Sequence, residues 1–326
     1  MKNRFHLLAT AVVSLLCVSC AETQVSQSGS EKAVNPPIMG WSSWNAFRVD
    51  ISEDIIKNQA DLMVKKGLKD AGYHYINIDD GFFGERDGNG KMQTNKNRFP
   101  NGMKPVADHI HSLGMKAGIY TDAGNNTCGS MSDQDKAGIG AGIYGHEAQD
   151  AQLYFGDWGF DFIKIDFLHA VCINHQNKSR AKQMYQALKF IRECAPNTLI
   201  LGCGVPLASA FGVVDYCRIG PDVSLIFDDV WFMKFMHRER ISTKITLQNT
   251  INRYYINGLG FNNDPDVYIM RKENVKLNEL QKDALIIINY IFGSIYMTSD
   301  NIANYDASKK ELIQKYQEYK HHKVVN

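Results

Sequence analysis

The chain has 326 residues, of which 44% are apolar and 22% are charged. This composition excludes a disordered or fibrous protein and fits a globular one. The formal net charge is +1, so no overall field favours nucleic acid or an acidic partner, and no run of Lys and Arg indicates a phosphate-binding stripe.

The first residues are typical of an export signal. Lys2 and Arg4 precede an apolar run over residues 7–18. This run has about the length of a signal-peptide core and is too short to span a bilayer. We therefore expect the protein to be exported.

The apolar run ends in the segment Cys17-Val18-Ser19-Cys20, and a polar stretch rich in Ser, Gln and Glu follows. This segment resembles a bacterial lipoprotein signal, which would make Cys20 the lipidated residue and the protein's link to a membrane. We expect a signal peptide over residues 1–20, a flexible tether over 21–35 and a cell-surface or periplasmic lipoprotein. A plain secretory signal is the alternative, because Cys17 stands where that motif usually has Leu.

From residue 36 onward, β-rich runs alternate with amphipathic helical stretches. Ser52 is a predicted helix N-cap, and Glu53 and Asp54 are favourable in the first turn that follows it. The predicted strands are 73–78, 115–121, 160–165, 199–203, 213–219 and 293–298, after a first strand that ends near Trp41. The other predicted helices are 103–113, 147–158, 181–194, 243–255 and 277–291.

Alternating strands and helices imply a parallel sheet. About eight such units predict an α/β fold of the (β/α)8 TIM-barrel type over residues 36–326, a size that suits this fold. No GxGxxG or Walker segment follows a predicted strand, which argues against nucleotide binding.

The seven cysteines give no metal or disulfide framework. Apart from the two in the signal segment they are Cys128, Cys172, Cys194, Cys203 and Cys217. Their number is odd and no pair has CxxC spacing, so we predict neither a zinc site nor any other metal or cofactor.

Carboxylates recur where the predicted strands end. They are Asp79, Asp80, Asp122, Asp166 and Asp222. In a barrel the carboxyl ends of all strands meet at one mouth, where the chemistry of this fold takes place.

Asp166 closes a strand with period-two alternation. Lys164 and Asp166 share one face of it. A buried Lys and Asp need partners or a ligand, and a nearby ammonium favours the ionised carboxylate that a nucleophile requires. The alternative is a buried ion pair that only fills the barrel.

Two further pairs have both functional and structural interpretations. Asp79 and Asp80 could accept hydrogen bonds from vicinal sugar hydroxyls, bind a hard cation or cap a helix. Trp41 and Trp44 could form an aromatic floor under a sugar or fill the end of the barrel.

Several segments resemble the α-galactosidases of glycoside hydrolase family 27, the melibiase group. In chain order they are Met39-Gly40-Trp41-Ser42-Ser43-Trp44-Asn45, Ile78-Asp79-Asp80-Gly81, Arg98-Phe99-Pro100-Asn101-Gly102, Gly118-Ile119-Tyr120-Thr121-Asp122, Lys164-Ile165-Asp166, Arg218-Ile219-Gly220-Pro221-Asp222 and Asn263-Asp264-Pro265-Asp266. They follow the family order from about residue 36 to 300.

This resemblance implies a retaining glycosidase that releases terminal α-linked galactose from oligosaccharides or glycans. Asp166 would be the nucleophile and Asp222 the general acid/base, with their carboxyl groups about 5–6 Å apart or slightly more. The implied substrate-binding residues are Trp44, Asp79, Asp80, Tyr120, Lys164, Cys203 and Arg218.

The chain also departs from that pattern. Leu168 stands where the family often has a Cys bonded to the counterpart of Cys128, so we do not expect that disulfide. The segment Cys203-Gly204 looks closer to the related family 36, where a strand-end Cys lines the pocket. The family's usual C-terminal β-domain is expected to be missing.

Three alternatives stay open at this point. The same chemistry could act on an α-N-acetylgalactosaminide or a β-L-arabinopyranoside. The chain could instead be an inactive carbohydrate-binding barrel at the cell surface. A metal-dependent barrel enzyme is a third possibility, which the lack of clustered His and Glu disfavours.

Overall fold

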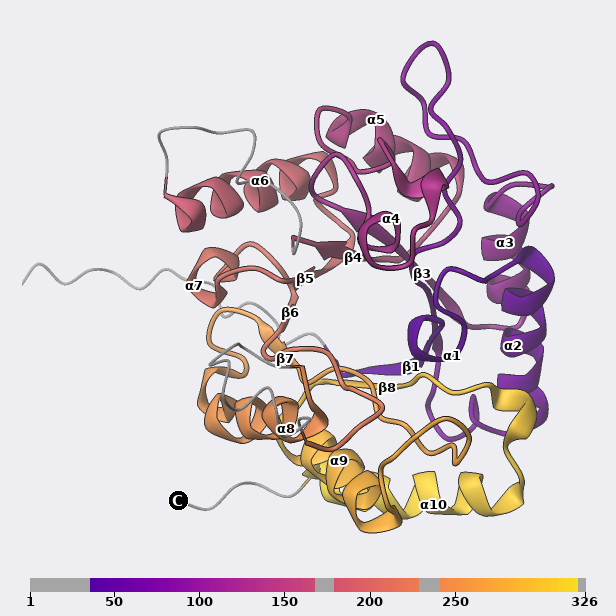
Figure 1. Ribbon diagram of the computed structural model, residues 1–326, viewed down its shortest axis with the longest axis vertical. Helices are drawn as coiled ribbons and strands as arrows, with labels where there is room; N and C mark the ends of the chain where they lie inside the picture. Colours follow the sequence, from indigo (N-terminus) through magenta and orange to yellow (C-terminus); the bar gives the residue numbers. More distant parts are fainter. Residues whose placement is uncertain (1–35, 168–178, 229–240, 322–326) are drawn as a thin grey trace, which may run out of the picture. The chain divides into compact units, whose positions relative to one another are not determined.

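Eight parallel strands form the centre of the fold (Figure 1). The computed structural model describes residues 36–167, 179–228 and 241–321. These residues belong to one compact unit, Asn35–Asn326. The expected signal peptide, tether and Cys20, together with Leu168 and Cys172, lie outside the described residues.

The strand order around the sheet is β7-β6-β5-β4-β3-β2-β1-β8, and neighbouring strands in this order are parallel. The strands are β1 Ile38–Ser42, β2 Tyr75–Ile78, β3 Lys116–Asp122, β4 Phe162–Asp166, β5 Leu199–Cys203, β6 Tyr216–Arg218, β7 Asn262–Asp264 and β8 Ile295–Thr298. The predicted TIM barrel is confirmed.

The barrel closes between β7 and β8 by isolated hydrogen bonds. The amide of Ser294 donates to the carbonyl of Asn263 at 2.8 Å, and the amide of Tyr268 donates to the carbonyl of Met297 at 2.9 Å. The residue before β8 is therefore bonded to β7, and β8 itself is bonded to the chain that follows β7.

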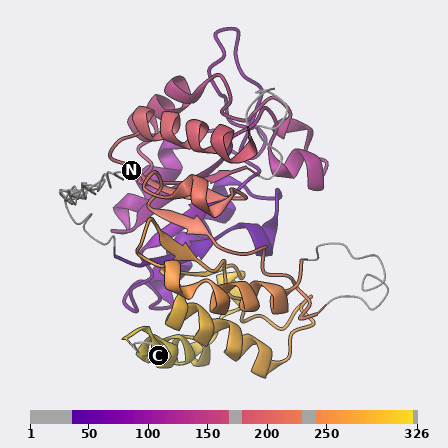
Figure 2. The same cartoon turned by 90° about the vertical axis from the view of Figure 1, so that its left-hand side faces the viewer.

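Helices surround the strands, as Figures 1 and 2 show. The longer ones are α2 Glu53–Lys65, α3 Lys104–Ser112, α6 Arg180–Cys194, α8 Thr243–Asn252, α9 Glu279–Phe292 and α10 Ala307–Gln317, and the short ones are α1 Trp44–Phe47, α4 Cys128–Ser132, α5 Glu147–Ala151 and α7 Leu207–Ala210. Within the described ranges, no helix has the length and apolar character that a membrane crossing requires.

Two predicted elements differ from the observed ones. The helix expected over 147–158 is α5 followed by a π-helical segment, Gln152–Asp157. The strand expected over 213–219 is reduced to β6, because residues 210–213 form turns that reverse the chain after α7.

Side chains alternate between the barrel interior and the helices, as predicted for β4. Phe162 and Lys164 line the pocket inside the barrel mouth, while Ile163 and Ile165 are fully buried in the apolar core. The barrel interior is therefore apolar at its base and charged at the carboxyl end of the strands.

The cap of α2 gives a first test of how local sequence stabilises the fold. Ser52 Oγ accepts a hydrogen bond from the amide of Ile55 at 3.3 Å. We expect Ser52→Ala to lower the free energy of unfolding by about 1 kcal/mol, since a helix N-terminal amide loses its partner. Urea denaturation measures this change. Ser52→Asp keeps an acceptor and should stay close to wild type, and equal losses in both variants would contradict the capping explanation.

Candidate active site

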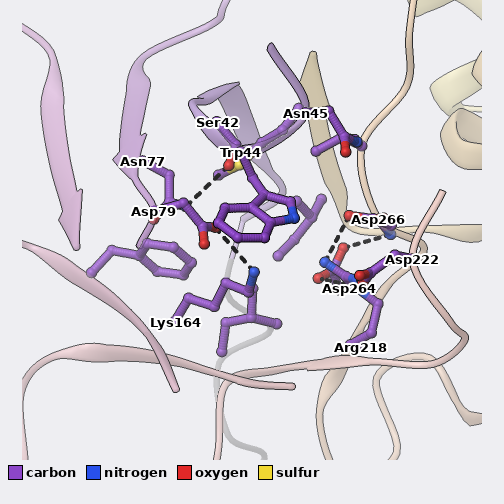
Figure 3. A pocket seen from close by; sticks show the side chains of 15 residues that line it. Ser42, Trp44, Asn45, Asn77, Asp79, Lys164, Arg218, Asp222, Asp264 and Asp266 are labelled. Atoms are coloured by element: carbon purple, nitrogen blue, oxygen red, sulfur yellow. Dashed lines mark hydrogen bonds and ion pairs between the residues drawn. The ribbon is translucent and has the colours of Figure 1, made fainter. Parts of the chain in front are cut away.

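A pocket opens at the carboxyl ends of the strands (Figure 3). Five of the predicted site residues line it, namely Trp44, Asp79, Lys164, Arg218 and Asp222. They come from four different strands or the loops that follow them, so the barrel brings together residues far apart in the sequence.

Lys164 and Asp79 form a buried ion pair across this pocket. The Lys164 Nζ atom lies 3.0 Å from Asp79 Oδ2. Burial alone would lower the pKa of Lys164, but the carboxylate of Asp79 and other acidic neighbours outweigh it and raise that pKa well above its ordinary value. Lys164 is therefore a permanent cation at the end of β4.

Arg218 at the end of β6 binds three carboxylates. Its guanidinium lies 2.8 Å from Asp222 Oδ1, 3.0 Å from Asp264 Oδ2 and 2.7 Å from Asp266 Oδ1. The Arg218 side chain is 7% exposed, whereas that of Asp222 is 51% exposed. Asp222 thus presents its carboxyl group to solvent while one oxygen is held by a buried cation.

Opposing influences act on the pKa of Asp266, one of the carboxylates around Arg218. Burial, aided by the charges of Asp222 and Asp264, raises the pKa of Asp266 to about 7, although Arg218 lowers it. Asp266 is nevertheless an acceptor at both oxygens, from Arg218 and from the amide of Val223. This arrangement favours its ionised form.

Asp166 lies in a row across three strands. The strand register pairs Asp166 with Asp122 of β3 on one side and with Cys203 of β5 on the other. Asp166 is 7% exposed and is not among the residues that line the pocket of Figure 3. It therefore sits at the same barrel mouth as Asp222, beside that pocket.

Asp122 is the residue that sequence reasoning placed at the mouth but left without a role. Its Oδ1 accepts from the Gly124 amide at 2.8 Å, and its Oδ2 lies 3.6 Å from the Cys128 thiol that donates to it. Burial and the neighbouring charge of Asp166 raise the pKa of Asp122 to about 8. Asp122 is therefore mostly protonated at neutral pH.

The donor atoms of Asp122, Cys128 and Asp166 all lie within 4.8 Å of one another, close enough to share a metal ion. Burial also raises the pKa of the Cys128 thiol, as do the charges of both aspartates. A metal ion would thus have to displace protons from the thiol and from Asp122.

Asp80, Tyr120 and Cys203 are buried and are not among the residues that line the pocket. Asp80 Oδ2 accepts from the amide of Gly129 in the first turn of α4 at 2.6 Å, and burial raises its pKa to about 7. The Tyr120 hydroxyl accepts from the Cys128 amide at 3.4 Å, and its ring centroid lies 5.4 Å from Lys164 Nζ. Cys203 is 6% exposed.

The two tryptophans of the first motif have different positions. Trp41 is fully buried, and its Nε1 donates to the carbonyl of Asp300 at 2.7 Å. Trp44 lines the pocket, where Figure 3 shows its indole between Asp79 and the Arg218 cluster. Only Trp44 is therefore available as a wall for a ligand.

Sequence reasoning missed Asp264 and Asp266 as site residues. Both line the pocket and hold Arg218. The segment Asn263-Asp264-Pro265-Asp266 belongs to the sequence resemblance, but β7, the strand that carries its first two residues, is only three residues long. The sequence feature that could have identified these two site residues is thus a cluster of acids around a proline, since the strand is too short to show alternation.

The fold and site together define a (β/α)8 barrel with an acidic mouth in which two buried cations hold the carboxylates. The model of the family described as alpha galactosidase A matches residues 36–320. The chain belongs to this family, the melibiases of glycoside hydrolase family 27.

Curated relatives agree with this assignment. The chain is 39% identical over 235 residues to a Dictyostelium discoideum protein named "Probable alpha-galactosidase", a match that covers 72% of this chain and 54% of the relative. It is 46% identical over 168 residues to "Alpha-galactosidase A" of Cellvibrio japonicus, covering 52% of this chain and 38% of the relative. The chain thus spans about half, or less, of the length of these relatives.

Solved structures are also similar. Alpha-galactosidase I from Mortierella vinacea superposes with a TM-score of 0.73 at 25% identity, covering 89% of this chain and 74% of that one. The Saccharomyces cerevisiae α-galactosidase superposes with a TM-score of 0.70 at 26% identity, covering 85% of this chain and 62% of that one.

The raised pKa of Asp122 predicts a specific dependence of stability on pH. In the unfolded chain this carboxyl ionises near its ordinary value of 3.8, whereas in the fold it stays protonated up to about pH 8. The folded state therefore binds more protons between these values, and Asp122 costs stability as the pH rises through this window.

We expect Asp122→Asn to gain stability relative to wild type between pH 5 and pH 8.5, by at least about 1 kcal/mol, since one pKa unit corresponds to about 1.4 kcal/mol. Urea denaturation at several pH values measures the difference. Asp80, whose pKa is also raised and whose charge adds to the raised pKa of Asp122, is present in both proteins. A difference that stays constant with pH would contradict this interpretation.

Proposed function

We propose that this chain is a retaining glycoside hydrolase that releases terminal α-linked galactose from oligosaccharides or glycans. The observation that carries the proposal is the pair Asp166 and Asp222, at the end of β4 and just after β6, around a mouth with the Asp79–Lys164 pair. Membership of the α-galactosidase A family supports this reading. One similar solved structure is described as the Saccharomyces cerevisiae α-galactosidase with raffinose.

In the proposed reaction Asp166 attacks the anomeric carbon and forms a covalent galactosyl intermediate. Asp222 donates a proton to the leaving oxygen and then removes a proton from the water that hydrolyses the intermediate. The half-exposed carboxyl of Asp222 suits exchange of protons with a leaving group and with water. The carboxyl separation of about 5–6 Å stays a prediction.

The remaining predicted residues would bind the sugar. Asp79 accepts and Lys164 donates hydrogen bonds, so the pair could hold vicinal hydroxyl groups, and Trp44 would form a pocket wall. Arg218 would orient Asp222. Asp80, Tyr120 and Cys203 would belong to the same sugar site, where Cys203-Gly204 resembles the strand-end Cys segment of family 36.

The reaction can be tested with p-nitrophenyl glycosides. We expect the α-galactoside to be hydrolysed, with kcat/KM falling by at least about 10³-fold in Asp166→Asn and by about 10²–10⁴-fold in Asp222→Asn. Hydrolysis of the α-N-acetylgalactosaminide or β-L-arabinopyranoside in its place would change the sugar but keep the mechanism. Binding without hydrolysis of any of them would identify an inactive carbohydrate-binding barrel.

Azide separates the two aspartates. In a nucleophile variant azide attacks the substrate directly, so a smaller variant such as Asp166→Gly should yield β-galactosyl azide. In an acid/base variant azide attacks the covalent intermediate, so Asp222→Gly should yield α-galactosyl azide. Nuclear magnetic resonance of the products distinguishes them, and the same anomer from both variants would contradict the assigned roles.

We also propose that the protein is an exported lipoprotein anchored through Cys20, on the basis of residues 1–20. In a bacterial host fed labelled palmitate, we expect the wild-type chain to take up label and Cys20→Ser to lose it. Cys17→Ser is the matched control and should keep the label. An unlabelled wild-type chain in the medium would instead indicate a plain secretory signal.

A further inference from the structure

The carboxylate of Asp266 connects two parts of the chain that flank Asp222. Its Oδ1 lies 2.7 Å from the Arg218 guanidinium, and its Oδ2 accepts a hydrogen bond of 2.6 Å from the amide of Val223. Arg218 in turn holds the Asp222 carboxyl at 2.8 Å, and Val223 is the residue after Asp222. One side chain therefore restrains Asp222 through its ion-pair partner and through its backbone.

Asp266 itself is held in an unusual conformation. Its φ is 76°, in the left-handed region that Asn and Asp adopt more readily than most residues other than Gly. Its amide donates to Asp264 Oδ1 at 2.8 Å, and its carbonyl accepts from the Asn289 side chain at 3.0 Å. Neighbouring elements thus determine the conformation that aims the carboxylate at Arg218 and Val223.

Within the described ranges, Arg218 holds the Asp222 carboxyl group, and the Thr246 hydroxyl donates to the Asp222 backbone carbonyl at 3.1 Å. The Asp222 side chain is 51% exposed, against 7% for Asp266. An exposed carboxyl samples several rotamers unless a specific contact selects one. The contacts through Arg218 and Val223 are therefore well placed to decide where the Asp222 carboxyl points.

We infer that Asp266 is a positioning residue for Asp222, which holds the general acid/base in place through Arg218 and the Val223 amide without needing to touch the substrate. This inference rests on the proposed function, because it presumes that Asp222 is the acid/base. It predicts a defect confined to the steps in which Asp222 transfers a proton.

The chain offers a matched control at the opposite end of β6. Asp215 also bridges an arginine and a backbone amide, since its Oδ2 accepts from Arg192 and, at 2.9 Å, from the amide of Ile200. It precedes β6, whereas Asp222 follows that strand. Asp215→Asn should therefore disturb a similar, partly buried bridge without affecting Asp222.

The experiment compares α-galactosides with good and poor leaving groups, 2,4-dinitrophenyl and methyl. General acid catalysis matters only for the poor one. For Asp266→Asn we expect kcat/KM to fall by about 10-fold to 100-fold on the methyl galactoside, part of the full effect of a general acid, and by less than about 3-fold on the dinitrophenyl galactoside. Asp215→Asn should affect both substrates equally.

The pH profile gives a second readout. Three carboxylates, Asp222, Asp264 and Asp266, face Arg218. Asp266→Asn removes one negative charge from this cluster, which favours the ionised state of the carboxyl groups that remain in it. We expect the alkaline limb of kcat/KM to move to lower pH in Asp266→Asn and to stay in place in Asp215→Asn.

Asp266→Gly serves as a second variant, because Gly accepts a positive φ and removes both contacts at once. A double-mutant cycle with Asp222→Asn completes the test, and the effect of Asp266→Asn should disappear in that background. Equal losses on both substrates, or additive losses in the cycle, would overturn the positioning role. If Asp222→Asn itself shows no leaving-group dependence, the result contradicts the acid/base role of Asp222 in the proposed function, and with it the positioning role that depends on it.

Discussion

The register of three neighbouring strands is the constraint on which the site depends. β3, β4 and β5 are aligned so that Asp122, Asp166 and Cys203 form one row at the carboxyl ends. A slip of one residue in any of these strands would turn the side chain away from the barrel interior. Ile163 and Ile165 are buried on the opposite face of β4. A slip in β4 would move these apolar side chains off the core, which would cost stability and so keeps the strand in register.

The negative charge of the buried acids at the barrel mouth must be compensated, and the barrel does this in two ways. Lys164 and Arg218 are buried cations that ion-pair with Asp79 and with the Asp264–Asp266 pair. Asp122 instead remains protonated, since burial and Asp166 raise its pKa to about 8. Only some of the acids at the mouth thus carry charge at neutral pH, which limits the repulsion that the fold must overcome.

The sequence predicted the features that depend on local pattern. Alternation along 160–166 correctly places Lys164 inside the barrel, and strand ends correctly locate Asp79 and Asp222 at its mouth. Local pattern could not decide between the two tryptophans, because Trp41 and Trp44 differ only in their tertiary contacts. Trp41 donates a hydrogen bond to the carbonyl of Asp300 after β8, whereas Trp44 lines the pocket. Nor could it find Asp264 and Asp266 as partners of Arg218, since β7 meets β6 only after more than forty residues of intervening chain.

Buried carboxyl groups hold the loop after β3 to the barrel. Cys128 is a free thiol, and burial keeps it protonated by raising its pKa. It can therefore donate a weak hydrogen bond to Asp122, which in turn accepts from the Gly124 amide. Asp80, through the Gly129 amide, fixes the same loop from the side of β2. The loop that borders Asp166 is thus tied to the barrel by two buried carboxyl groups, Asp122 and Asp80, whose pKa values are both raised. Its attachment and the electrostatics around the proposed nucleophile consequently depend on the same protons.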